Sequence, residues 1–413
     1  MYKRSFNKSA RPGFSGAKPR PRFGTASRGF PRRQTGGRKN FGERIDPARF
    51  INKAVVMTEA TEHFKPEHAF ADFAIDERLK TAIAAKGYVL PTPIQDKTIS
   101  HGLKGSDVVG IANTGTGKTA AFLIPLINKI MIDSKQKVII IVPTRELAVQ
   151  IESELIGFVR NIKTGPRINS VCCVGGAPIY KQIQALKAQQ NFVIGTPGRL
   201  KDLVTRKCIF LSQFNTIVLD EADRMLDMGF IADMRLVVSQ MPKDRQTLFF
   251  SATISHEVEG LIKDFLKDPV RISVKTGETA RNVDQDVVHV RGGNKLDILH
   301  ALLSKSEFSK VLIFGRTKHG VEKLSHALAS KGFKAESIHG NKNFSQRQRA
   351  LKSFKDNQAK ILVATDVAAR GLDIADVSHV INFDLPATHD DYVHRIGRTG
   401  RGNKTGKALT FIE

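Results

Sequence analysis

The chain has 413 residues, 41% of them hydrophobic, and a formal net charge of +25. This length predicts two or three domains, and the hydrophobic content is enough for most of the chain to form buried cores. The charge favours a polyanionic partner, which leaves nucleic acid, an anionic membrane and an acidic protein open. Three cysteines without a CxxC pair argue against a disulfide framework and against a cysteine-rich zinc site.

The sequence also argues against a membrane span and a secretory signal. The longest apolar runs, such as Val138 to Val142, are far shorter than a bilayer requires, and the N-terminus has no apolar core. No acidic residue precedes Glu43, as in organellar transit peptides, but four prolines and frequent glycines would break the amphipathic helix of such a peptide. We therefore expect a cytoplasmic protein that has no membrane partner.

Residues 1–53 differ in composition from the rest of the chain. Fifteen Lys or Arg and two acidic residues give this segment +13 of the net charge, and six phenylalanines are spread among Arg, Gly and Pro. No helical or strand period runs through it, so we predict a disordered basic tail. The tail either keeps the protein soluble or tethers RNA. Composition favours the tether, because Arg neutralises phosphate and Phe stacks on bases.

From residue 54 short apolar runs alternate with helical patterns. Such runs indicate buried parallel strands when helices separate them, which is typical of doubly wound α/β domains. In the first half we predict strands at 138–142, 192–194, 217–219 and 248–250, with helices at 120–132 and 145–158. The N-terminal domain should cover residues 54–275.

A second set of strands is predicted at 311–314, 361–363 and 380–383, within a C-terminal domain of residues 285–413. The polar stretch 276–284 contains glycine and should be the linker. The two halves also share a similar motif after a strand. It is Pro143-Thr144-Arg145 in the first half and Gly315-Arg316-Thr317-Lys318 in the second. Open α/β sheets bind ligands at such strand ends.

A phosphate-binding loop is predicted at residues 112–119, between an apolar stretch and a helix. The strict pattern begins with Gly and this loop begins with Ala, but the rest of the pattern holds. Gly115 and Gly117 let backbone N–H groups face phosphate oxygens, and the helix N-terminus adds positive charge. Lys118 can then bridge the β- and γ-phosphates of ATP, and the Thr119 hydroxyl can bind Mg²⁺.

An acidic motif, Asp220-Glu221-Ala222-Asp223, directly follows the predicted strand 217–219. Enzymes with a phosphate-binding loop place a magnesium-binding carboxylate at a strand end. We assign Asp220 to Mg²⁺, through water because this ion keeps part of its hydration shell. Glu221 can orient or deprotonate the attacking water. An acidic turn after a strand is common by itself, and the combination with Lys118 indicates a site.

Positive charge for the γ-phosphate is available in the second half, within residues 394–401. Arg395, Arg398 and Arg401 occur at a spacing of three, so they share a face if the segment is helical. A guanidinium group binds phosphate through two parallel hydrogen bonds. A solvated basic face is the alternative interpretation.

Together these motifs resemble the DEAD-box ATP-dependent RNA helicases of superfamily 2, from about residue 70 to the C-terminus and in the family's order. The resemblance implies two tandem RecA-like doubly wound parallel-sheet domains behind the basic tail. It also implies an RNA-dependent ATPase with ATP and Mg²⁺ as cofactors. Asp223, where DEAH relatives have His, points away from those processive enzymes.

The resemblance assigns roles residue by residue. It implies nucleotide contacts from Phe70, Tyr88, Gln95, Ala112, Asn113, Thr114, Gly115, Thr116, Gly117, Lys118, Thr119, Gly371 and Asp373. It implies RNA contacts from Pro143, Thr144, Arg145, Gly176, Thr196, Arg199, Thr317, Gln346, Arg349, Thr365, Asp366 and Arg370. It makes Arg398 and Arg401 arginine fingers, and it couples hydrolysis to strand separation through Asp223, Ser251, Thr253 and His394. Side-chain chemistry is consistent with binding of adenine. The Tyr88 ring can stack on a base, and the Gln95 amide can both donate a hydrogen bond to adenine and accept one from it.

The predicted site is split along the chain. Lys118 and Glu221 precede the linker, and Arg398 lies about 180 residues after Glu221, so hydrolysis should require the halves to close and should couple ATP binding to RNA binding. Contacts to the RNA backbone carry no sequence information.

Three alternative functions remain open: a long-lived RNA clamp, a DNA helicase, and an interaction protein whose nucleotide site is inactive. The last would lack a lysine, acid or finger, and none is missing. Protein partners cannot be read from these motifs.

Overall fold

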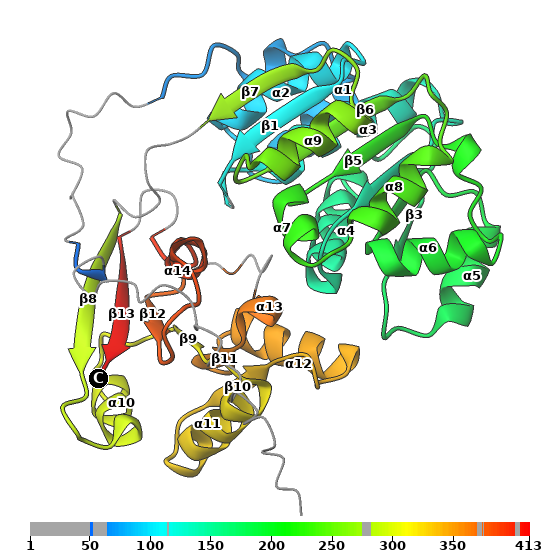
Figure 1. The fold of residues 1–413 in the computed structure, drawn as a ribbon. Coiled ribbons are helices and arrows are strands. Elements are labelled where there is room, and N and C mark those ends of the chain that lie inside the picture. Colours follow the sequence, from blue (N-terminus) through cyan, green and yellow to red (C-terminus); the bar gives the residue numbers. More distant parts are fainter. Residues whose placement is uncertain are drawn as a thin grey trace, which may run out of the picture. The chain divides into compact units, whose positions relative to one another are not determined.

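The computed structural model describes residues 50–52, 64–113, 115–274, 282–369, 374, 376–400 and 405–413. The described residues contain two parallel sheets, each packed between helices (Figure 1). Most of the predicted tail and linker lie outside the described ranges. So do five predicted site residues, which are Thr114, Arg370, Gly371, Asp373 and Arg401. Across these described ranges, no helix is long and apolar enough to cross a membrane.

The first sheet has seven strands within the described residues, all parallel and in the order β3-β4-β2-β5-β6-β1-β7. Its strands are β1 (Val108–Ala112), β2 (Val138–Ile141), β3 (Ser170–Cys173), β4 (Phe192–Gly195), β5 (Thr216–Leu219), β6 (Gln246–Ser251) and β7 (Val270–Val274). The four strands predicted in this half are confirmed by β2, β4, β5 and β6. β1 lies between β6 and β7, so the phosphate loop begins inside the sheet.

Both faces of the first sheet are buried, which explains the continuous apolar runs of its strands. In β2, Val138 and Ile140 belong to one core cluster and Ile139 and Ile141 to the other, because side chains alternate along a strand. The first cluster includes side chains of α1 (Glu77–Ala85), α2 (Pro93–Leu103), α3 (Lys118–Ile132) and α4 (Arg145–Val159). The second includes side chains of α5 (Ile179–Lys187), α6 (Pro197–Thr205), α7 (Ala222–Asp227), α8 (Ile231–Ser239) and α9 (His256–Phe265).

The second sheet has six parallel strands within the described residues, in the order β10-β11-β9-β12-β13-β8. Its strands are β8 (Val283–His289), β9 (Val311–Phe314), β10 (Ala335–Ile338), β11 (Ile361–Ala364), β12 (His379–Asn382) and β13 (Gly406–Ile412). Its helices are α10 (Lys295–Leu303), α11 (Lys318–Ser330), α12 (Phe344–Lys355), α13 (Asp366–Ala369) and α14 (His389–Ile396). β9, β11 and β12 confirm the three predicted strands. β8 begins at Val283, so Val283 and Asp284 belong to the sheet and not to the predicted linker.

The similar motifs that follow a strand in each half of the sequence both provide a helix cap. Thr144 follows β2 and caps α4, where its side chain accepts a hydrogen bond from the N–H of Leu147. Thr317 follows β9 and caps α11 by accepting from the N–H of Gly320. A Thr at this position supplies an acceptor that the first helical turn otherwise lacks. The two motifs therefore perform the same local task at equivalent strand ends.

One short segment of the predicted tail is part of the folded protein. Residues 50–52 lie against β8, and the side chain of Phe50 is only 1% exposed. The prediction of a disordered tail that extends to residue 53 is therefore wrong for these three residues. Composition could not separate Phe50 from the other five phenylalanines, because its burial depends on contacts more than 200 residues away in sequence.

Candidate nucleotide and RNA site

The phosphate-binding loop leaves the sheet at Ala112 and ends at Lys118, the first residue of α3. Gly117 caps the helix in the left-handed region, with φ +92°. The conformation favours glycine, and a Cβ at this position would come within 2.4 Å of Gln95 Nε2 and displace that side chain. The Thr116 hydroxyl donates to the Asn113 carbonyl at 2.8 Å and closes the turn.

Lys118 is held inside this loop. Its Nζ donates to the Ala112 carbonyl at 2.8 Å, and the residue is buried. The contact uses the backbone of Ala112, so it does not depend on whether this position holds Ala or the Gly of the strict pattern. The loop therefore presents a fixed positive charge beside a helix N-terminus, the arrangement that favours bound phosphate.

The acidic motif begins where β5 ends, next to β2 and β6. Burial raises the pKa of the Asp220 carboxyl to about 6, and the Lys118 ammonium opposes this shift. Burial also acts against ionisation of Asp223, but Lys118, Arg224 and hydrogen bonds from Thr253 outweigh it and lower the pKa of Asp223. A cation near Asp220 would stabilise its charged form.

Glu221 has an unusual backbone and an ionic partner. Its φ is +54°, in the left-handed region that a side chain rarely adopts. Its Oε2 accepts from Arg224 Nη1 at 3.0 Å, and both side chains are buried. The left-handed turn lets α7 begin immediately after β5, so the three acids are brought together at one strand end.

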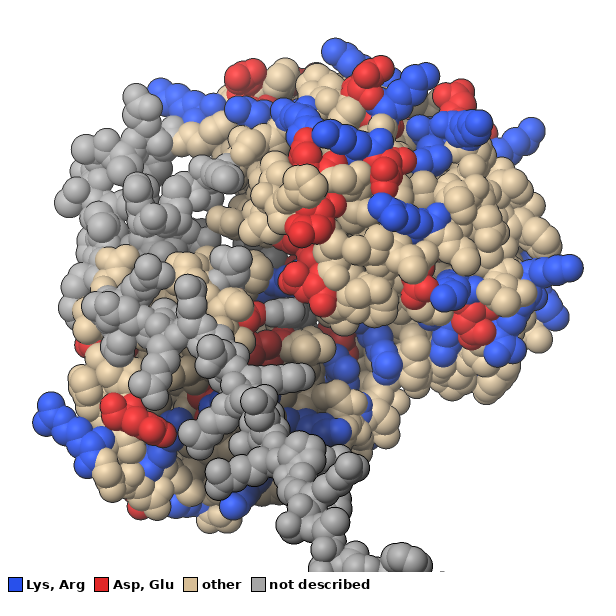
Figure 2. All heavy atoms as spheres, viewed as in Figure 1, with Lys and Arg blue, Asp and Glu red and all other residues tan. Residues whose placement is uncertain are grey.

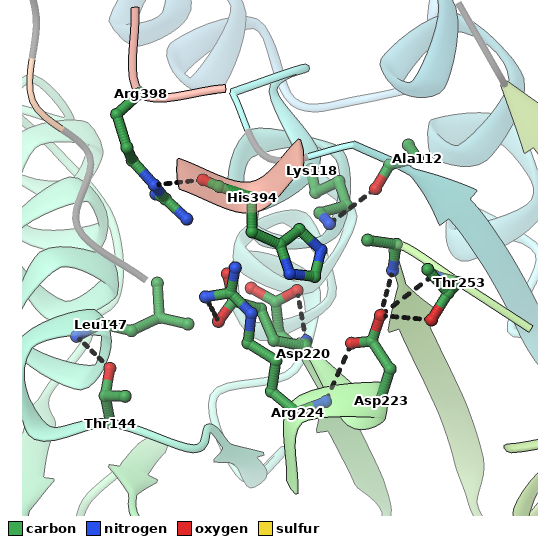
Figure 3. A network of polar contacts seen from close by, with 12 residues as sticks. Ala112, Lys118, Thr144, Leu147, Asp220, Asp223, Arg224, Thr253, His394 and Arg398 are labelled. Carbon is green, nitrogen blue, oxygen red and sulfur yellow. Dashed lines mark hydrogen bonds and ion pairs between the residues drawn. The ribbon is translucent and has the colours of Figure 1, made fainter. Parts of the chain in front are cut away.

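Asp223 joins the acidic motif to the end of β6 (Figure 3). Its Oδ2 accepts from the backbone N–H groups of Ala252 and Thr253 at 3.1 and 2.9 Å, and from the Thr253 hydroxyl at 3.0 Å. The Ser251 hydroxyl in turn donates to the Thr253 carbonyl at 2.7 Å. A shift of Asp223 would therefore move the backbone after β6.

The residues expected to contact adenine have other neighbours in this structure. Gln95 donates to the Gly117 carbonyl at 3.1 Å and accepts from the Thr92 N–H at 2.9 Å, so it ties α2 to the phosphate loop. The amide retains one N–H and one lone pair for a base. Tyr88 packs against Phe70 and Phe158, and its hydroxyl donates to Glu154 at 2.8 Å. Tyr88 therefore has aromatic and polar partners in the protein, and its stacking on a base stays a prediction.

Several predicted RNA contacts of the first domain lie together. The Arg145 side chain passes so close to Gly176 that a Cβ there would come within 2.3 Å of Arg145 Nη1, and Gly176 has φ +79°. Arg199 donates to Gln182 at 2.8 Å and to the Ala177 carbonyl at 3.3 Å. Thr144 caps α4 after Pro143, and Thr196 directly precedes α6 at its N-cap position. The glycine pair 175–176 thus makes room for a guanidinium at this edge of the sheet.

The second domain corrects the predicted arginine face. α14 ends at Ile396 with Gly397 as its C-cap, so Arg398 lies beyond the helix and does not share a helical face with Arg395. Arg395 is buried and donates to both carboxylate oxygens of Asp366, at 2.6 and 2.8 Å. Asp366 therefore positions Arg395 here, and this contact does not support its predicted role at RNA. Arg398 Nε donates to the His394 carbonyl at 3.3 Å (Figure 3).

The remaining predicted RNA residues lie at helix starts of this domain. Thr317 caps α11, and Thr365 directly precedes α13. Gln346 forms a capping box with Asn343 at the start of α12, with both hydrogen bonds at 2.9 Å. Arg349 is exposed one turn later, on the same side of α12 as Gln346.

Two family models match this chain. The DEAD/DEAH box helicase model matches residues 92–261, and the helicase conserved C-terminal domain model matches residues 294–403. The chain belongs to the DEAD-box ATP-dependent RNA helicases. One relative, the DEAD-box ATP-dependent RNA helicase CshA of Bacillus subtilis, is 47% identical over 83% of this chain and 69% of its own length. CshA of Geobacillus kaustophilus is 44% identical over 83% of this chain and 73% of its own.

Solved DEAD-box structures agree with the fold. The DEAD-box helicase Mss116 bound to single-stranded RNA and UDP-BeF has a TM-score of 0.76 and 31% identity, over 85% of this chain and 76% of its own. S. cerevisiae Dbp5 bound to RNA and ADP BeF3 has a TM-score of 0.73 and 29% identity, over 84% and 89% of the two chains. The prediction of two RecA-like parallel-sheet domains is thus confirmed.

Sequence reasoning missed one residue of this DEAD-box site. Arg224 is 2% exposed and is the ionic partner of Glu221. The i, i+3 spacing of Glu221 and Arg224 is a weak signal of this pair, because Glu221 caps α7 in a left-handed conformation and does not lie within the helix. In the sequence, a basic residue directly after an acidic motif has the pattern of an exposed surface turn.

Proposed function

We propose that this chain binds ATP–Mg²⁺ at the strand ends of its first domain and uses ATP hydrolysis to separate short RNA duplexes locally or to remodel RNA–protein complexes. One observation carries the proposal. Lys118 follows β1, Asp220 and Glu221 follow β5, and Asp223 is bonded to Thr253 after β6. The carboxyl ends of the neighbouring strands β5, β6 and β1 thus bring together the lysine proposed to bind phosphate, three carboxylates and the threonine proposed for coupling.

The nucleotide roles follow from these positions. Lys118 would contact the β- and γ-phosphates, the loop 112–119 would surround them, and Glu221 would orient and deprotonate the attacking water. Arg224 keeps the Glu221 carboxylate in place. Gln95 and Phe70 would border the base, with Gly371 and Asp373 near the ribose.

Magnesium fits the residues at this edge. Asp220 is buried with a raised pKa, so its charged form lacks sufficient positive compensation, and Thr119 lies in the first turn of α3. Within the described part of the chain, no three His, Cys, Asp or Glu side chains gather as a metal site. Mg²⁺ is commonly held by one or two carboxylates and the substrate phosphates, so such a cluster is not needed. The ion would neutralise charge that develops on the phosphates.

Hydrolysis would be completed by the second domain. Arg398 and Arg401 would stabilise charge at the γ-phosphate, as arginine fingers do in phosphoryl transfer. Asp223, Ser251, Thr253 and His394 would couple this step to RNA. Because the arginines and the acids come from different domains, closure would make ATP turnover depend on bound RNA.

RNA would lie across exposed and half-buried groups of both domains. Arg145, Arg199 and the backbone at Gly176 would contact phosphates in the first, and Thr317, Gln346, Arg349 and Thr365 in the second. The similar Mss116 and Dbp5 structures, which contain RNA, support RNA as the partner. Three cysteines in the whole sequence fit a reducing compartment, and we propose the cytoplasm.

The proposal is tested by comparing nucleic acids. Single-stranded RNA should stimulate ATP hydrolysis by about tenfold or more, and DNA of the same sequence should not, because the 2′-hydroxyl distinguishes them. ATP should also release the shorter strand of an RNA duplex of roughly ten base pairs, whose few stacked steps closure can disrupt. Equal stimulation by DNA would support a DNA translocase, and stable retention of RNA without strand release would support a clamp.

We also propose that the basic tail tethers RNA. On the face shown in Figure 2, basic and acidic side chains are mixed over the described surface. The tail differs, since residues 1–53 hold +13 of the +25 net charge. Concentrated positive charge binds phosphate without sequence preference and in a salt-dependent manner. Its phenylalanines would stack on bases.

Deletion of residues 1–49 tests the tether. We expect weaker RNA binding and a flatter dependence of log affinity on log salt, because each lost phosphate contact on a single strand removes about 0.7 from the slope. ATP hydrolysis at saturating RNA should be retained, since the deletion leaves both domains and Phe50. Titrations of fluorescent RNA at several salt concentrations measure the slope. An unchanged slope would refute the tether and leave the solubilising role.

A further inference from the structure

The segment 50–52, which we call the strap, is joined to the outer edge of the second sheet. Asn52 and Gln285 form an antiparallel bridge in which each backbone N–H donates to the carbonyl of the other residue, at 3.0 and 2.7 Å. Among the described residues, β8 is the edge strand of that sheet and pairs within the sheet with β13. Figure 1 shows the short blue segment of residues 50–52 beside β8.

Phe50 anchors the strap in an apolar socket. The socket is formed by Val283 of β8, Ala408 of β13, and Tyr392 and Ile396 of α14. The Phe50 and Tyr392 rings meet edge to face, with centroids 4.7 Å apart and an interplanar angle of 61°. A ring that is 1% exposed makes contacts that an exposed tail residue would not have. The strap is therefore built into this face of the domain.

The socket and the strand pairing share one polar contact. The Tyr392 hydroxyl donates to Gln285 Oε1 at 2.8 Å, and both residues are buried. Gln285 thus pairs with the strap through its backbone and with α14 through its side chain. Removal of Phe50 would open a space directly beside Tyr392, which is the residue that connects α14 to β8 at this point.

α14 is the helix that leads to the proposed arginine finger. Tyr392 and Ile396 are four residues apart and both contact Phe50's socket, so the strap packs on one side of this helix. From the same helix, Arg395 extends to Asp366 and to the Asp384 carbonyl. α14 ends at Ile396, two residues before Arg398, which donates back to the His394 carbonyl. The position of Arg398 therefore depends on how α14 is seated.

We propose that Phe50 is a positioning residue for ATP hydrolysis, because the strap seats α14 and so places Arg398. This inference rests on the proposed role of Arg398 at the γ-phosphate. It differs from the tether, which concerns RNA affinity and the basic residues before the strap. The strap acts at saturating RNA and changes the rate of the chemical step.

The test uses the full chain with ATP and RNA at saturation. Phe50→Ala should lower kcat for RNA-stimulated hydrolysis by about tenfold, since small displacements of a reacting group have effects of this size. The KM for ATP and the affinity for ADP should stay within about twofold, because the Lys118 loop is untouched. Phe50→Leu keeps most of the apolar volume and should recover most of kcat. Deletion of residues 1–52 should match Phe50→Ala, and deletion of 1–49 should not.

Two further variants separate positioning from loss of stability. Phe333→Ala removes a ring of the same size just before β10, at the opposite edge of the same sheet, and should leave kcat unchanged. In the Arg398→Ala background, Phe50→Ala should lower kcat no further, because residues that act as a unit are not additive.

The outcomes distinguish the inference from the function on which it rests. If Arg398→Ala keeps full kcat, the finger assignment fails and the strap inference fails with it. If Arg398→Ala lowers kcat but Phe50→Ala does not, only the strap inference is overturned. It is also overturned if the two losses multiply in the double variant, or if Phe333→Ala is as impaired as Phe50→Ala.

Discussion

Replacement of Glu221 by Gln is expected to reduce RNA-stimulated ATP turnover by about 10²-fold or more while ATP binding is retained. General-base catalysis contributes on this scale, and an amide cannot take up the proton of the attacking water at neutral pH. Gln keeps the size of the side chain. Its carbonyl can still accept from Arg224 Nη1, so the buried guanidinium keeps an acceptor.

The measurement pairs a steady-state ATPase assay with titration of a fluorescent nucleotide. Glu259→Gln is the matched control, because Glu259 on α9 also pairs with an arginine, Arg271 at 2.7 Å, and lies outside the acidic motif. The control should hydrolyse ATP at the normal rate. Undiminished turnover in Glu221→Gln would contradict the general-base assignment. Glu221→Ala is a poorer choice, since it leaves a buried arginine unpaired and lowers stability.

Local pattern was sufficient for the phosphate loop and the strands beside it. A buried parallel strand needs apolar residues on both faces, so β2 and β9 appear in sequence as continuous runs. The loop needs glycine where backbone must approach phosphate, and Gly117 meets that need. Short or partly polar strands were missed. β3 alternates buried and half-buried residues at the edge of the sheet, and β8 contains two aspartates.

Contacts between distant residues could not be predicted in this way. Tyr88 packs against Phe158, and Phe50 packs against Tyr392, in both cases through tertiary structure. An aromatic residue in a motif or in a basic tail has no local signal that distinguishes stacking on a base from burial in a core. The end of α14 is different, because Gly397 is a local stop signal, whereas the arginine spacing predicts a shared face only if the helix continues.

Replacement of Lys118 by Ala is expected to abolish measurable ATP turnover, with a loss of about 10²- to 10³-fold in kcat/KM. Removal of one charged donor from a buried site of phosphoryl transfer has effects of this size. Lys118 is only 6% exposed, so bulk water cannot take over the hydrogen bonds and the charge of its ammonium group. Its loss also deprives the buried carboxylates Asp220 and Asp223 of a positive neighbour. The free energy of unfolding must therefore be measured together with activity.

Lys129→Ala is the control that separates these two effects. Lys129 lies on the same helix, in its last turn, where Nζ donates to the Thr216 hydroxyl at 2.9 Å and burial lowers its pKa. Both substitutions remove an ammonium from α3, buried at Lys118 and half-buried at Lys129, but only Lys118 bonds to the phosphate loop. We expect Lys129→Ala to lower the unfolding temperature and to keep nucleotide affinity. Equal loss of ATP binding in both variants would show that the Lys118 effect comes from damage to the fold. Normal ATP turnover by Lys118→Ala would contradict the assignment of Lys118 as a phosphate contact.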